Sequence, residues 1–393
     1  MKRVFAKRLF SVSACLATAC ASVPVLAADE IKVGLMLPFS GTYAQLGEAV
    51  EKGFKLHIDE QGGRLAGKTV TYVRVDDESE PSKASDNVNK LIKRDKVDVI
   101  VGTVHSGVVM AMAKAAKSSK TLLIIPHAGT DEVTGAMCAP NIFRSSFSNW
   151  QPAYGAGKLA VEKGYKRIVT VSWKYTAGEE SLRGFKEGIK GSGSSVVSDL
   201  TVPFPNTEFQ ALLTQISALK PDAVYAFFGG AGAVKFVKDY AAAGLGRTIP
   251  LIGSGFLTEG VLQAEGAAAE GLQTTLHYAD GLNSEVDKAF RAAYAKAYGA
   301  GPDVYAVQGY DAAQMLAHGL KATGGDLGKQ AGIVKAIETM TVNSPRGAFK
   351  LSKAHSPVQD IYTRTVASGE NRYTSIAAKG VGSPSDGCAM AAR

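Results

Sequence analysis

The sequence predicts an α/β fold in which helices cover both faces of parallel sheets. Strand-like apolar runs recur along the chain, and amphipathic helical patterns lie between them. This alternation is typical of βαβ units, because each helix returns the chain to the start of a parallel neighbouring strand. The length of 393 residues fits two domains or one large one, at roughly 150 residues per domain.

The expected elements follow one another from residue 31 onward. The expected strands are 31–37, 69–75, 97–101, 121–125, 167–171, 223–228 and 249–252. The expected helices include 46–60, 82–93, 108–117, 151–163 and 234–243. The rhythm breaks at 143–147, where a strand-like piece leads into a new run of units, and this break predicts a lobe boundary. A second candidate boundary lies at 277–283.

The first residues are expected to be a secretory signal peptide. Four cations lie within the first eight residues, and 9–26 is mostly apolar and small. Small residues then offer a cleavage point near Ala27. A membrane anchor is less favoured, because serines and Pro24 interrupt a stretch that is short for a span. A lipoprotein cleaved before Cys20 is a further alternative.

The charge of the chain does not indicate nucleic acid or an anionic membrane surface as a partner. Removal of the four leader cations lowers the formal net charge from +8 to +4. This excess is mild and includes no basic run.

Two of the four cysteines leave with the leader, and Cys138 and Cys388 remain. In an exported protein such a pair predicts a disulfide. The bond would hold a tail that otherwise frays, since Cys388 lies close to the C-terminus. Two separate thiols are the alternative.

Residues 62–69 read GGRLAGKT, which matches the spelling of a phosphate-binding loop, G-x-x-x-x-G-K-[ST]. That loop requires a strand before it and a helix after it, so that N–H groups point at the phosphate. Here the helical pattern EAVEKGFKLHIDEQ precedes the motif and the alternating pattern TVTYVRVDD follows it. The order argues against ATP binding by this chain, and Gly62-Gly63 is expected to end the helix.

The residues do not assemble into a recognisable catalytic or metal-binding motif. The six histidines are His57, His105, His127, His277, His318 and His355, without paired metal spacing. The sequence contains no G-x-S-x-G elbow, and 229–232 is too short for a dinucleotide fingerprint. His127 lies near Asp131 and Glu132, but no nucleophile accompanies them. No enzyme, cofactor or metal is predicted, and an exported hydrolase is the alternative of another class.

Several segments together carry a family resemblance. In chain order they include EIKVGLMLPFSGTYAQLG, VDVIVGTVHSG, TLLIIPHAGTDEVT, NIFRSS, DAVYAFFGGAGAVKFVKDYAAAGL, IPLIGSGFLTE and YAVQGYDAAQML. This set resembles the type I periplasmic solute-binding proteins of the branched-chain amino-acid ABC transporter class, which are Leu/Ile/Val-binding-protein-like. The similarity is greatest to the branch that takes up aromatic acids. It covers nearly the whole chain after the leader.

The resemblance implies two Rossmann-like lobes joined by three hinge crossings, with the ligand cleft between them. The leader would occupy 1–27. The N-lobe would comprise 28–145 plus 279–355, and the C-lobe 146–278 plus 356–393, including a C-terminal tail. The strand-end loops are independently expected to face the cleft, because open α/β sheets bind ligands beyond the carboxyl ends of their strands.

The resemblance also implies which loops hold the carboxylate of a ligand. These are 105–107 and 128–130 of the N-lobe. Ser106 and Thr130 would offer hydroxyl groups, and Gly107, Ala128 and Thr130 would offer backbone N–H groups. The full set of expected ligand-binding residues is Tyr43, His105, Ser106, Gly107, Ala128, Gly129, Thr130, Tyr175, Phe228, Phe256, His277 and Gln308.

The expected ammonium site departs from the amino-acid-binding pattern. The loop that carries an acidic residue in amino-acid binders has Gly255 and Phe256 here, and the position of an aromatic hydroxyl is Ala231. A desolvated ammonium without a partner costs several kcal/mol. Rings gather instead at Tyr43, Tyr175, Phe228 and Phe256, and His105 joins the carboxylate loop, so we expect an aromatic carboxylate such as a benzoate or hydroxycinnamate. A branched-chain or other amino acid, or a short amide, is the alternative.

Individual residues keep competing interpretations. Phe228 could equally belong to the core, and His105 could serve only as a helix cap. A phenolic hydroxyl on the ligand would need a partner, for which His277, Tyr175 and Gln308 are candidates.

The resemblance implies a monomer in the periplasm that delivers its ligand to an ABC permease. Transport would be powered by separate ATPase subunits.

Overall fold

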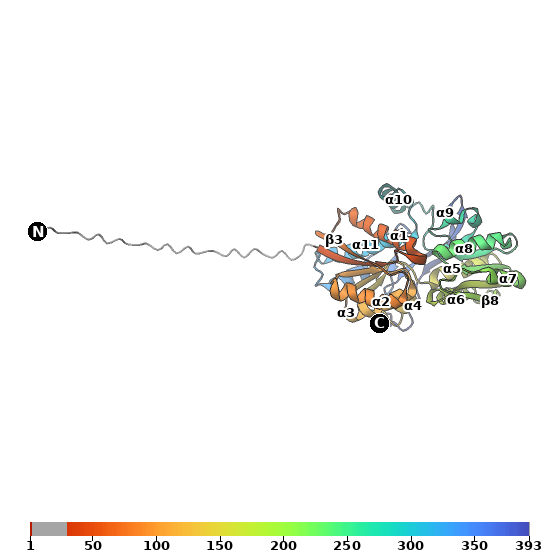
Figure 1. The fold of residues 1–393 in the computed structure, drawn as a ribbon, viewed down its shortest axis with the longest axis horizontal. Coiled ribbons are helices and arrows are strands. Elements are labelled where there is room, and N and C mark those ends of the chain that lie inside the picture. The colour runs from red at the N-terminus through yellow and green to blue at the C-terminus, as the bar shows by residue number, and fades with distance from the viewer. Residues whose placement is uncertain (2–29, 393) are drawn as a thin grey trace.

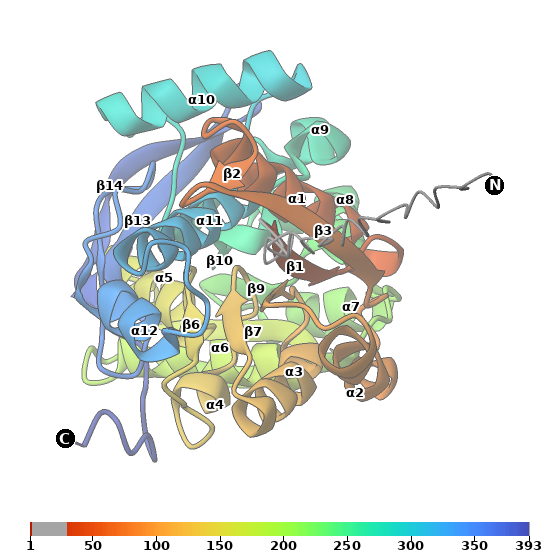
Figure 2. The same ribbon diagram turned by 90° about the vertical axis from the view of Figure 1, so that its left-hand side faces the viewer.

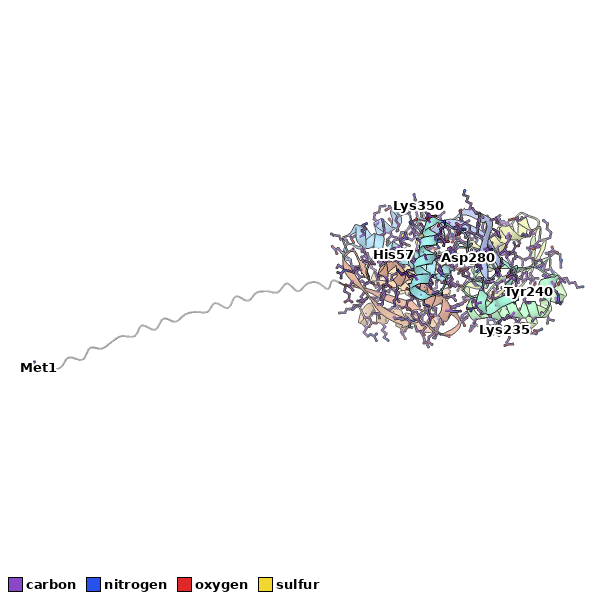
Figure 3. All side chains as sticks on the ribbon, turned by 90° about the horizontal axis from the view of Figure 1, so that it is seen from above. Met1, His57, Lys235, Tyr240, Asp280 and Lys350 are labelled. Carbon is purple, nitrogen blue, oxygen red and sulfur yellow. A yellow bond between two sulfur atoms is a disulfide. The ribbon has the colours of Figure 1, made fainter. Side chains whose placement is uncertain are left out.

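The computed structural model describes Met1 and residues 30–392, which form two lobes side by side (Figure 1). Beyond Met1, the predicted leader lies outside the described residues. Seen from above, His57 lies in one lobe, Tyr240 in the other and Asp280 between them (Figure 3).

The first lobe is built on a six-stranded sheet with the order β2-β3-β1-β4-β5-β6. Its strands are β1 (Glu30–Leu37), β2 (Arg64–Leu65), β3 (Lys68–Asp76), β4 (Val99–Gly102), β5 (Leu122–Ile125) and β6 (Ile142–Arg144). All neighbours pair in parallel except β2 with β3. β4 (VIVG) and β5 (LLII) are apolar and buried throughout, as expected of strands covered by helices on both faces.

Helices cover both faces of this sheet. They are α1 (Ala44–Asp59), α2 (Pro81–Asn89) with a π-helical extension (Lys90–Arg94), α3 (Ser106–Ser119), α4 (Asp131–Thr134), α11 (Val304–Ala322) and α12 (Gln330–Thr339), and a 3-10 turn η1 (Gly41–Tyr43) precedes α1. Ile31, Val33 and Leu35 pack with α1, α11 and α12, whereas Met36 packs with α2 and α3. Figure 2 shows α1 and α11 above the sheet and α2 and α3 below it.

The second lobe is built on an eight-stranded sheet with the order β12-β13-β11-β10-β9-β7-β8, and β14 pairs with β13. Its strands are β7 (Arg167–Lys174), β8 (Ser195–Pro203), β9 (Ala223–Phe227), β10 (Leu251–Ser254), β11 (Gln273–Leu276), β12 (Lys350–Leu351), β13 (Pro357–Ala367) and β14 (Glu370–Val381). β7 to β11 run parallel, and β13 runs antiparallel to β11 and β14.

The remaining helices belong to the second lobe or to its junction with the first. They are α5 (Trp150–Glu162), α6 (Thr176–Ile189), α7 (Gln210–Leu219), α8 (Gly230–Ala242), α9 (Leu262–Glu265) and α10 (Glu285–Tyr298), with 3-10 turns η3 (Leu245–Arg247), η4 (Gly255–Leu257) and η5 (Gly266–Ala269). Helix α10 lies at the top of Figure 1, and the Tyr298 hydroxyl donates to the Lys52 carbonyl of α1 over 2.9 Å.

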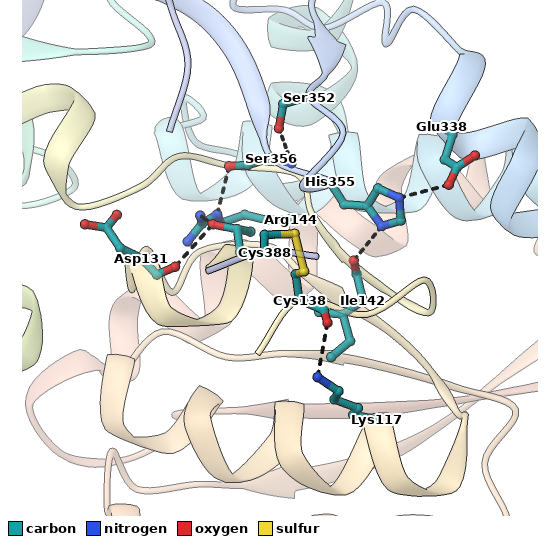
Figure 4. The surroundings of a disulfide bond; sticks show 11 residues. Lys117, Asp131, Cys138, Ile142, Arg144, Glu338, Ser352, His355, Ser356 and Cys388 are labelled. Carbon is teal, nitrogen blue, oxygen red and sulfur yellow. Dashed lines mark hydrogen bonds and ion pairs between the residues drawn. A yellow bond between two sulfur atoms is a disulfide. The ribbon is translucent and has the colours of Figure 1, made fainter. Parts of the chain in front are cut away.

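The chain passes between the lobes three times. It leaves the first sheet after β6, returns at α11 and leaves again before β13. The last residues come back to the first lobe, where Cys388 forms the predicted disulfide with Cys138 at a Cα–Cα distance of 5.6 Å. Figure 4 shows this bond, with Lys117 Nζ donating to the Cys138 carbonyl. The disulfide thus links the C-terminal tail to the first lobe, although the preceding strands β13 and β14 belong to the second lobe.

The order of elements around GGRLAGKT is as predicted. Helix α1 ends at Asp59, Gly62 and Gly63 adopt φ of +70° and +74°, and Lys68 opens β3. Left-handed values of this kind favour glycine in a turn after a helix. The motif therefore lacks the following helix that a phosphate loop requires.

The helical pair α1 and α11 depends on small residues where the two backbones approach. A Cβ on Gly53 would lie 1.9 Å from the Ala306 carbonyl oxygen, and one on Gly309 would lie 2.0 Å from that of Val50. This approach fixes the N-terminal turn of α11, which carries Tyr305 into the space between the lobes.

All seven expected strands and all five expected helices are present, with shifts of a few residues at their ends. The sequence analysis missed β8, β11, β13 and β14. β8 is a half-exposed edge strand, and β13 and β14 form a long antiparallel hairpin. Their burial is set by partners that lie far away in the chain.

Candidate functional site

An enclosed cavity lies between the lobes, where loops from the carboxyl ends of both sheets meet. It is lined by Tyr43, Leu46, Val104, Ser106, His127, Phe147, Asn149, Tyr175, Ala177, Phe227, Gly229, Phe256 and Tyr305. The cavity itself has a volume of about 20 Å³, roughly the room of one water molecule, so the side chains of the two lobes lie close together in this form.

Both lobes contribute to the wall. The first lobe supplies residues from η1 and α1, from the loops after β4 and β5, and from the start of α11. The second lobe supplies the start of α6 and the loops after β9 and β10. Phe147 and Asn149 come from the first crossing between the lobes. The expectation that strand-end loops form the cleft therefore agrees with the structure.

Two tyrosines join the lobes at one end of the cavity. The hydroxyl groups of Tyr43 and Tyr175 lie 3.0 Å apart, which is hydrogen-bond distance. Burial raises the pKa of both phenols, so both remain neutral at physiological pH. Phe204, which the sequence analysis did not single out, packs against both rings at centroid distances of 5.6 and 5.1 Å.

His105 caps helix α3. Its Nδ1 accepts a hydrogen bond from the backbone N–H of Gly107 over 3.0 Å. Burial lowers the pKa of His105 to about 4, so the ring is neutral and the proton is on Nε2. The cap interpretation of His105 is confirmed, and the Gly107 N–H is already used by the protein.

The second predicted carboxylate loop is also engaged by protein groups. The Ala128 N–H donates to the Thr103 carbonyl over 2.9 Å, and the Gly129 carbonyl accepts from the Asn149 N–H over 2.8 Å. A Cβ on Gly129 would lie 2.6 Å from Asn149 Oδ1, so only glycine fits against this crossing. The Thr130 hydroxyl donates to Glu180 over 2.9 Å.

Glu180, which the sequence analysis did not single out, connects the second lobe to the first. It lies on α6 of the second lobe, and its carboxylate accepts hydrogen bonds from Thr130 Oγ1, Asp131 N–H and Asn149 Nδ2. Asn149 Nδ2 also lies 3.2 Å from Ser106 Oγ. Of the two predicted loops, Ser106 is the member that lines the cavity.

Phe228 does not line the cavity, which corrects one expectation. The ring is fully buried and packs against Trp173, Phe209 and Phe236 at centroid distances of 4.7 to 5.2 Å. Phe227 lines the cavity instead. Successive side chains at a strand end point to opposite sides, so the two neighbours cannot share this role.

The other end of the cavity is a ring-lined pocket around His127. The ring centroids of Phe147, Phe256 and Tyr305 lie 5.0, 5.2 and 5.1 Å from that of His127. Phe256 and Phe147 also contact each other at 4.8 Å. Phe256 therefore occupies a wall position, as expected from the sequence.

A buried chain of hydrogen bonds holds His127 from behind. His127 Nδ1 lies 2.7 Å from Gln308 Oε1, and Gln308 Nε2 lies 3.0 Å from His277 Nε2. Burial lowers the pKa of His127 to about 4 and that of His277 well below its usual value, so both rings are neutral. Gln308 and His277 lie one layer outside the cavity, whereas the sequence analysis placed them in contact with the ligand. The signal for His127 was its position immediately before the loop 128–130.

Comparison with known proteins identifies the architecture. A family model for periplasmic binding proteins matches residues 30–371. The chain belongs to the periplasmic binding protein family. This membership confirms the predicted fold class and the prediction of a solute-binding protein rather than an enzyme.

Individual relatives of this periplasmic binding protein agree. A solute-binding protein of an ABC transporter from R. palustris, solved in complex with benzoate, is 50% identical and superposes with a TM-score of 0.90. That match covers 92% of this chain and 99% of the other. One from Rhodopseudomonas palustris BisB5, in complex with 3,4-dihydroxybenzoic acid, is 32% identical with a TM-score of 0.85, covering 91% and 99%. The Leu/Ile/Val-binding protein homolog 6 of Brucella melitensis is 28% identical over 351 residues, 88% of this chain and 89% of the relative.

The family of this periplasmic binding protein implies an extracytoplasmic location. Among the helices of residues 30–392, none has both the length and the apolar character needed to cross a membrane.

Proposed function

We propose that this protein is the substrate-binding component of an ABC importer and captures a small aromatic carboxylate, of the benzoate or hydroxycinnamate type, by closing its lobes. The observation that carries the proposal is the cavity wall. Rings from both lobes surround a narrow space, and none of the described residues that line it is acidic. Rings stack favourably on an aromatic ligand, by roughly 0.5–1.5 kcal/mol per pair beyond the burial of area.

The carboxylate of the ligand is proposed to bind beside Ser106 and Asn149. Ser106 is the first residue of α3, a helix of fourteen residues, and both Ser106 and Asn149 line the cavity. The helix dipole favours an anion at this N-terminus, and Ser106 Oγ, which accepts from Asn149 Nδ2, keeps its own proton to donate to the carboxylate. Tyr43 and Tyr175, one from each lobe, would close over the ring of the ligand.

An amino-acid ligand is the second candidate, since relatives of this chain include Leu/Ile/Val-binding protein homologues. The residues that line the cavity argue against an amino-acid ligand. The Glu180 carboxylate, which accepts from Asn149 of the cavity wall, is already occupied by three protein donors. An ammonium group enclosed here would lack an acidic partner, at a cost of several kcal/mol.

The partner and location follow from the same proposal. The closed form would present both lobes to a membrane permease, with separate ATPase subunits supplying energy. Closure would be a population shift driven by the higher affinity of the closed state for ligand. We further propose a periplasmic monomer, a leader cleaved near Ala27, and lobe boundaries at 145/146, 278/279 and 355/356.

A ligand survey tests this function. Ligand-stripped mature protein is screened by thermal shift, followed by calorimetry, with benzoates, hydroxycinnamates, leucine, valine and short amides. Binding at a hundredfold excess over Kd stabilises the folded state by about 2.7 kcal/mol. A shift with at least one aromatic acid and little with leucine is expected. A large shift with leucine and none with any aromatic acid would overturn the proposal.

A pair of serine variants tests the position of the carboxylate. S106A should weaken binding of the best aromatic acid by about 10- to 100-fold, because a hydrogen bond to a charged group contributes about 1.5–3 kcal/mol. The control S118A lies on the exposed far end of the same helix and should bind as the unaltered protein does. Equal affinities for all three proteins would show that the carboxylate binds elsewhere.

A further inference from the structure

The ring-lined pocket around His127 contains a polar atom that the protein leaves for a ligand. His127 lines the cavity, and its Nδ1 is held by Gln308 Oε1 at 2.7 Å. The nitrogen that remains for a ligand is Nε2. The surrounding rings of Phe147 and Phe256 offer no hydrogen-bonding group, so Nε2 dominates the polarity of this end.

The hydrogen-bond chain determines what Nε2 can do. The amide oxygen of Gln308 can only accept, so His127 Nδ1 carries the proton. The amide nitrogen of Gln308 faces the other way and donates to His277 Nε2. A neutral imidazole protonated on Nδ1 has a lone pair on Nε2 and accepts a hydrogen bond there. This end of the cavity therefore repels a carboxylate oxygen and attracts a hydrogen-bond donor.

A second polar group at this end also has no partner. Tyr305 is fully buried, its ring lies 5.1 Å from that of His127, and its hydroxyl has no hydrogen-bond partner within residues 30–392. A buried hydroxyl without a partner costs about 1–3 kcal/mol. A ligand oxygen bound at this end would both donate to His127 and be able to accept from a tyrosine.

We propose that His127 Nε2 accepts a hydrogen bond from a ring hydroxyl of the ligand, so that the protein prefers a hydroxylated benzoate over benzoate itself. The inference rests on the proposed function, since it takes the ligand to be an aromatic acid whose carboxylate lies at the Ser106 end. His127 is the residue that sets specificity, and Gln308 and His277 are positioning residues that fix its protonated nitrogen.

Calorimetry with matched ligands tests the inference. The probes are benzoate, 3- and 4-hydroxybenzoate, and 4-methylbenzoate, whose methyl group has the size of a hydroxyl but cannot donate. The better hydroxybenzoate should bind at least tenfold more tightly than benzoate and 4-methylbenzoate. Similar affinities for all four would overturn the inference and leave the proposed function intact. Failure of every aromatic acid would instead remove the proposed function. 4-Aminobenzoate, a second donor, should retain part of the preference if donation to Nε2 is the cause.

Variants assign the preference to one side chain. H127F keeps a flat ring among Phe147, Phe256 and Tyr305 but has no nitrogen, so the variant should bind hydroxybenzoates no more tightly than it binds benzoate. H57F is the matched control, because His57 is a half-buried neutral imidazole that packs on Tyr310 in the first lobe. H57F should keep the full preference. A preference that survives in H127F would overturn the inference.

A measurement on the unaltered protein keeps the inference testable if H127F does not fold. Nitrogen NMR of labelled histidine separates a protonated from an unprotonated ring nitrogen. His127 should show an unprotonated Nε2 whose signal moves on addition of hydroxybenzoate and stays in place with 4-methylbenzoate. A protonated Nε2 in the free protein, or the same response to both ligands, would contradict the assignment.

Discussion

The Glu180 carboxylate is expected to lock the closed arrangement of the lobes. It lies on α6 of the second lobe and accepts from the Thr130 hydroxyl and the Asp131 N–H of the first lobe, both over 2.9 Å. Asn149 Nδ2 of the first crossing donates to it over 2.7 Å. These bonds require the lobes to be together, so an open form would lose the two contacts to the first lobe. Burial raises the pKa of Glu180, and the donors Asn149, Asp131 and Thr130 oppose that rise.

The substitution E180A measures this lock. A net hydrogen bond contributes about 0.5–1.5 kcal/mol, so the two bonds lost on opening contribute about 1–3 kcal/mol to the closed form. If the ligand-free protein is mainly open, the whole loss appears in the apparent Kd. Since about 1.4 kcal/mol corresponds to a factor of ten, binding should weaken by about 5- to 150-fold.

Calorimetry gives the affinity, and small-angle scattering gives the compaction on binding. E180Q should be intermediate, because its amide oxygen can still accept from Thr130 and Asp131 while its amide nitrogen opposes the donor on Asn149. E179A is the matched control, since Glu179 is the exposed neighbour on the same helix. If E180A binds within twofold of the unaltered protein and compacts equally, these contacts do not stabilise closure and the reasoning is wrong.

Three further predictions concern stability. Both carboxyl oxygens of Glu265 are buried without a partner in the described part of the chain, and burial raises the pKa of Glu265 to about 8. The folded state then retains a proton that the unfolded state loses above its ordinary pKa, so stability is lost as the pH rises toward 8. Denaturant titrations at pH 5 and 8.5 should show that E265Q loses up to about 4 kcal/mol less unfolding free energy between these pH values than the unaltered protein does. Equal losses in the two proteins would contradict this prediction. The denatured, unreduced protein should show no free thiol, and replacing Cys138 and Cys388 by serine should cost about 2–5 kcal/mol; two thiols in the assay would refute the bond. G309A places a Cβ 2.0 Å from a carbonyl oxygen of α1 and should cost about 3 kcal/mol, whereas G301A meets no atom within 4 Å and should be neutral by thermal melting.

Much of the fold could be predicted from the sequence because its central strands are buried on both faces. Such strands are continuous apolar runs, as in 122–125 and 223–227, and they are recognisable without knowledge of their neighbours. The order helix, glycine turn, strand around 62–69 was equally local and excluded a phosphate loop. By contrast, β8 and the β13–β14 hairpin are half-exposed, and their sequences alone carry a weaker pattern.

The candidate site could be predicted as a set of loops, but its inner surface could not. Tyr43, Ser106, Tyr175 and Phe256 were expected at the cleft, and they line the cavity. The loop 128–130 was expected to hold the ligand, but its Thr130 hydroxyl donates to a carboxylate that comes from the other lobe.

The sequence by itself determined the α/β class, the lobe pattern, the loops that face the cleft and the absence of an acidic residue opposite the ammonium position. Only the tertiary structure decided which side chain of each loop reaches the ligand. It placed Phe227 rather than Phe228 in the wall, and His127 in front of Gln308, from which it is separated by 181 residues. The physical reason is that side-chain direction and hydrogen-bond partners are fixed by contacts between elements remote in the chain. Local sequence patterns report burial, but they contain no information on these contacts.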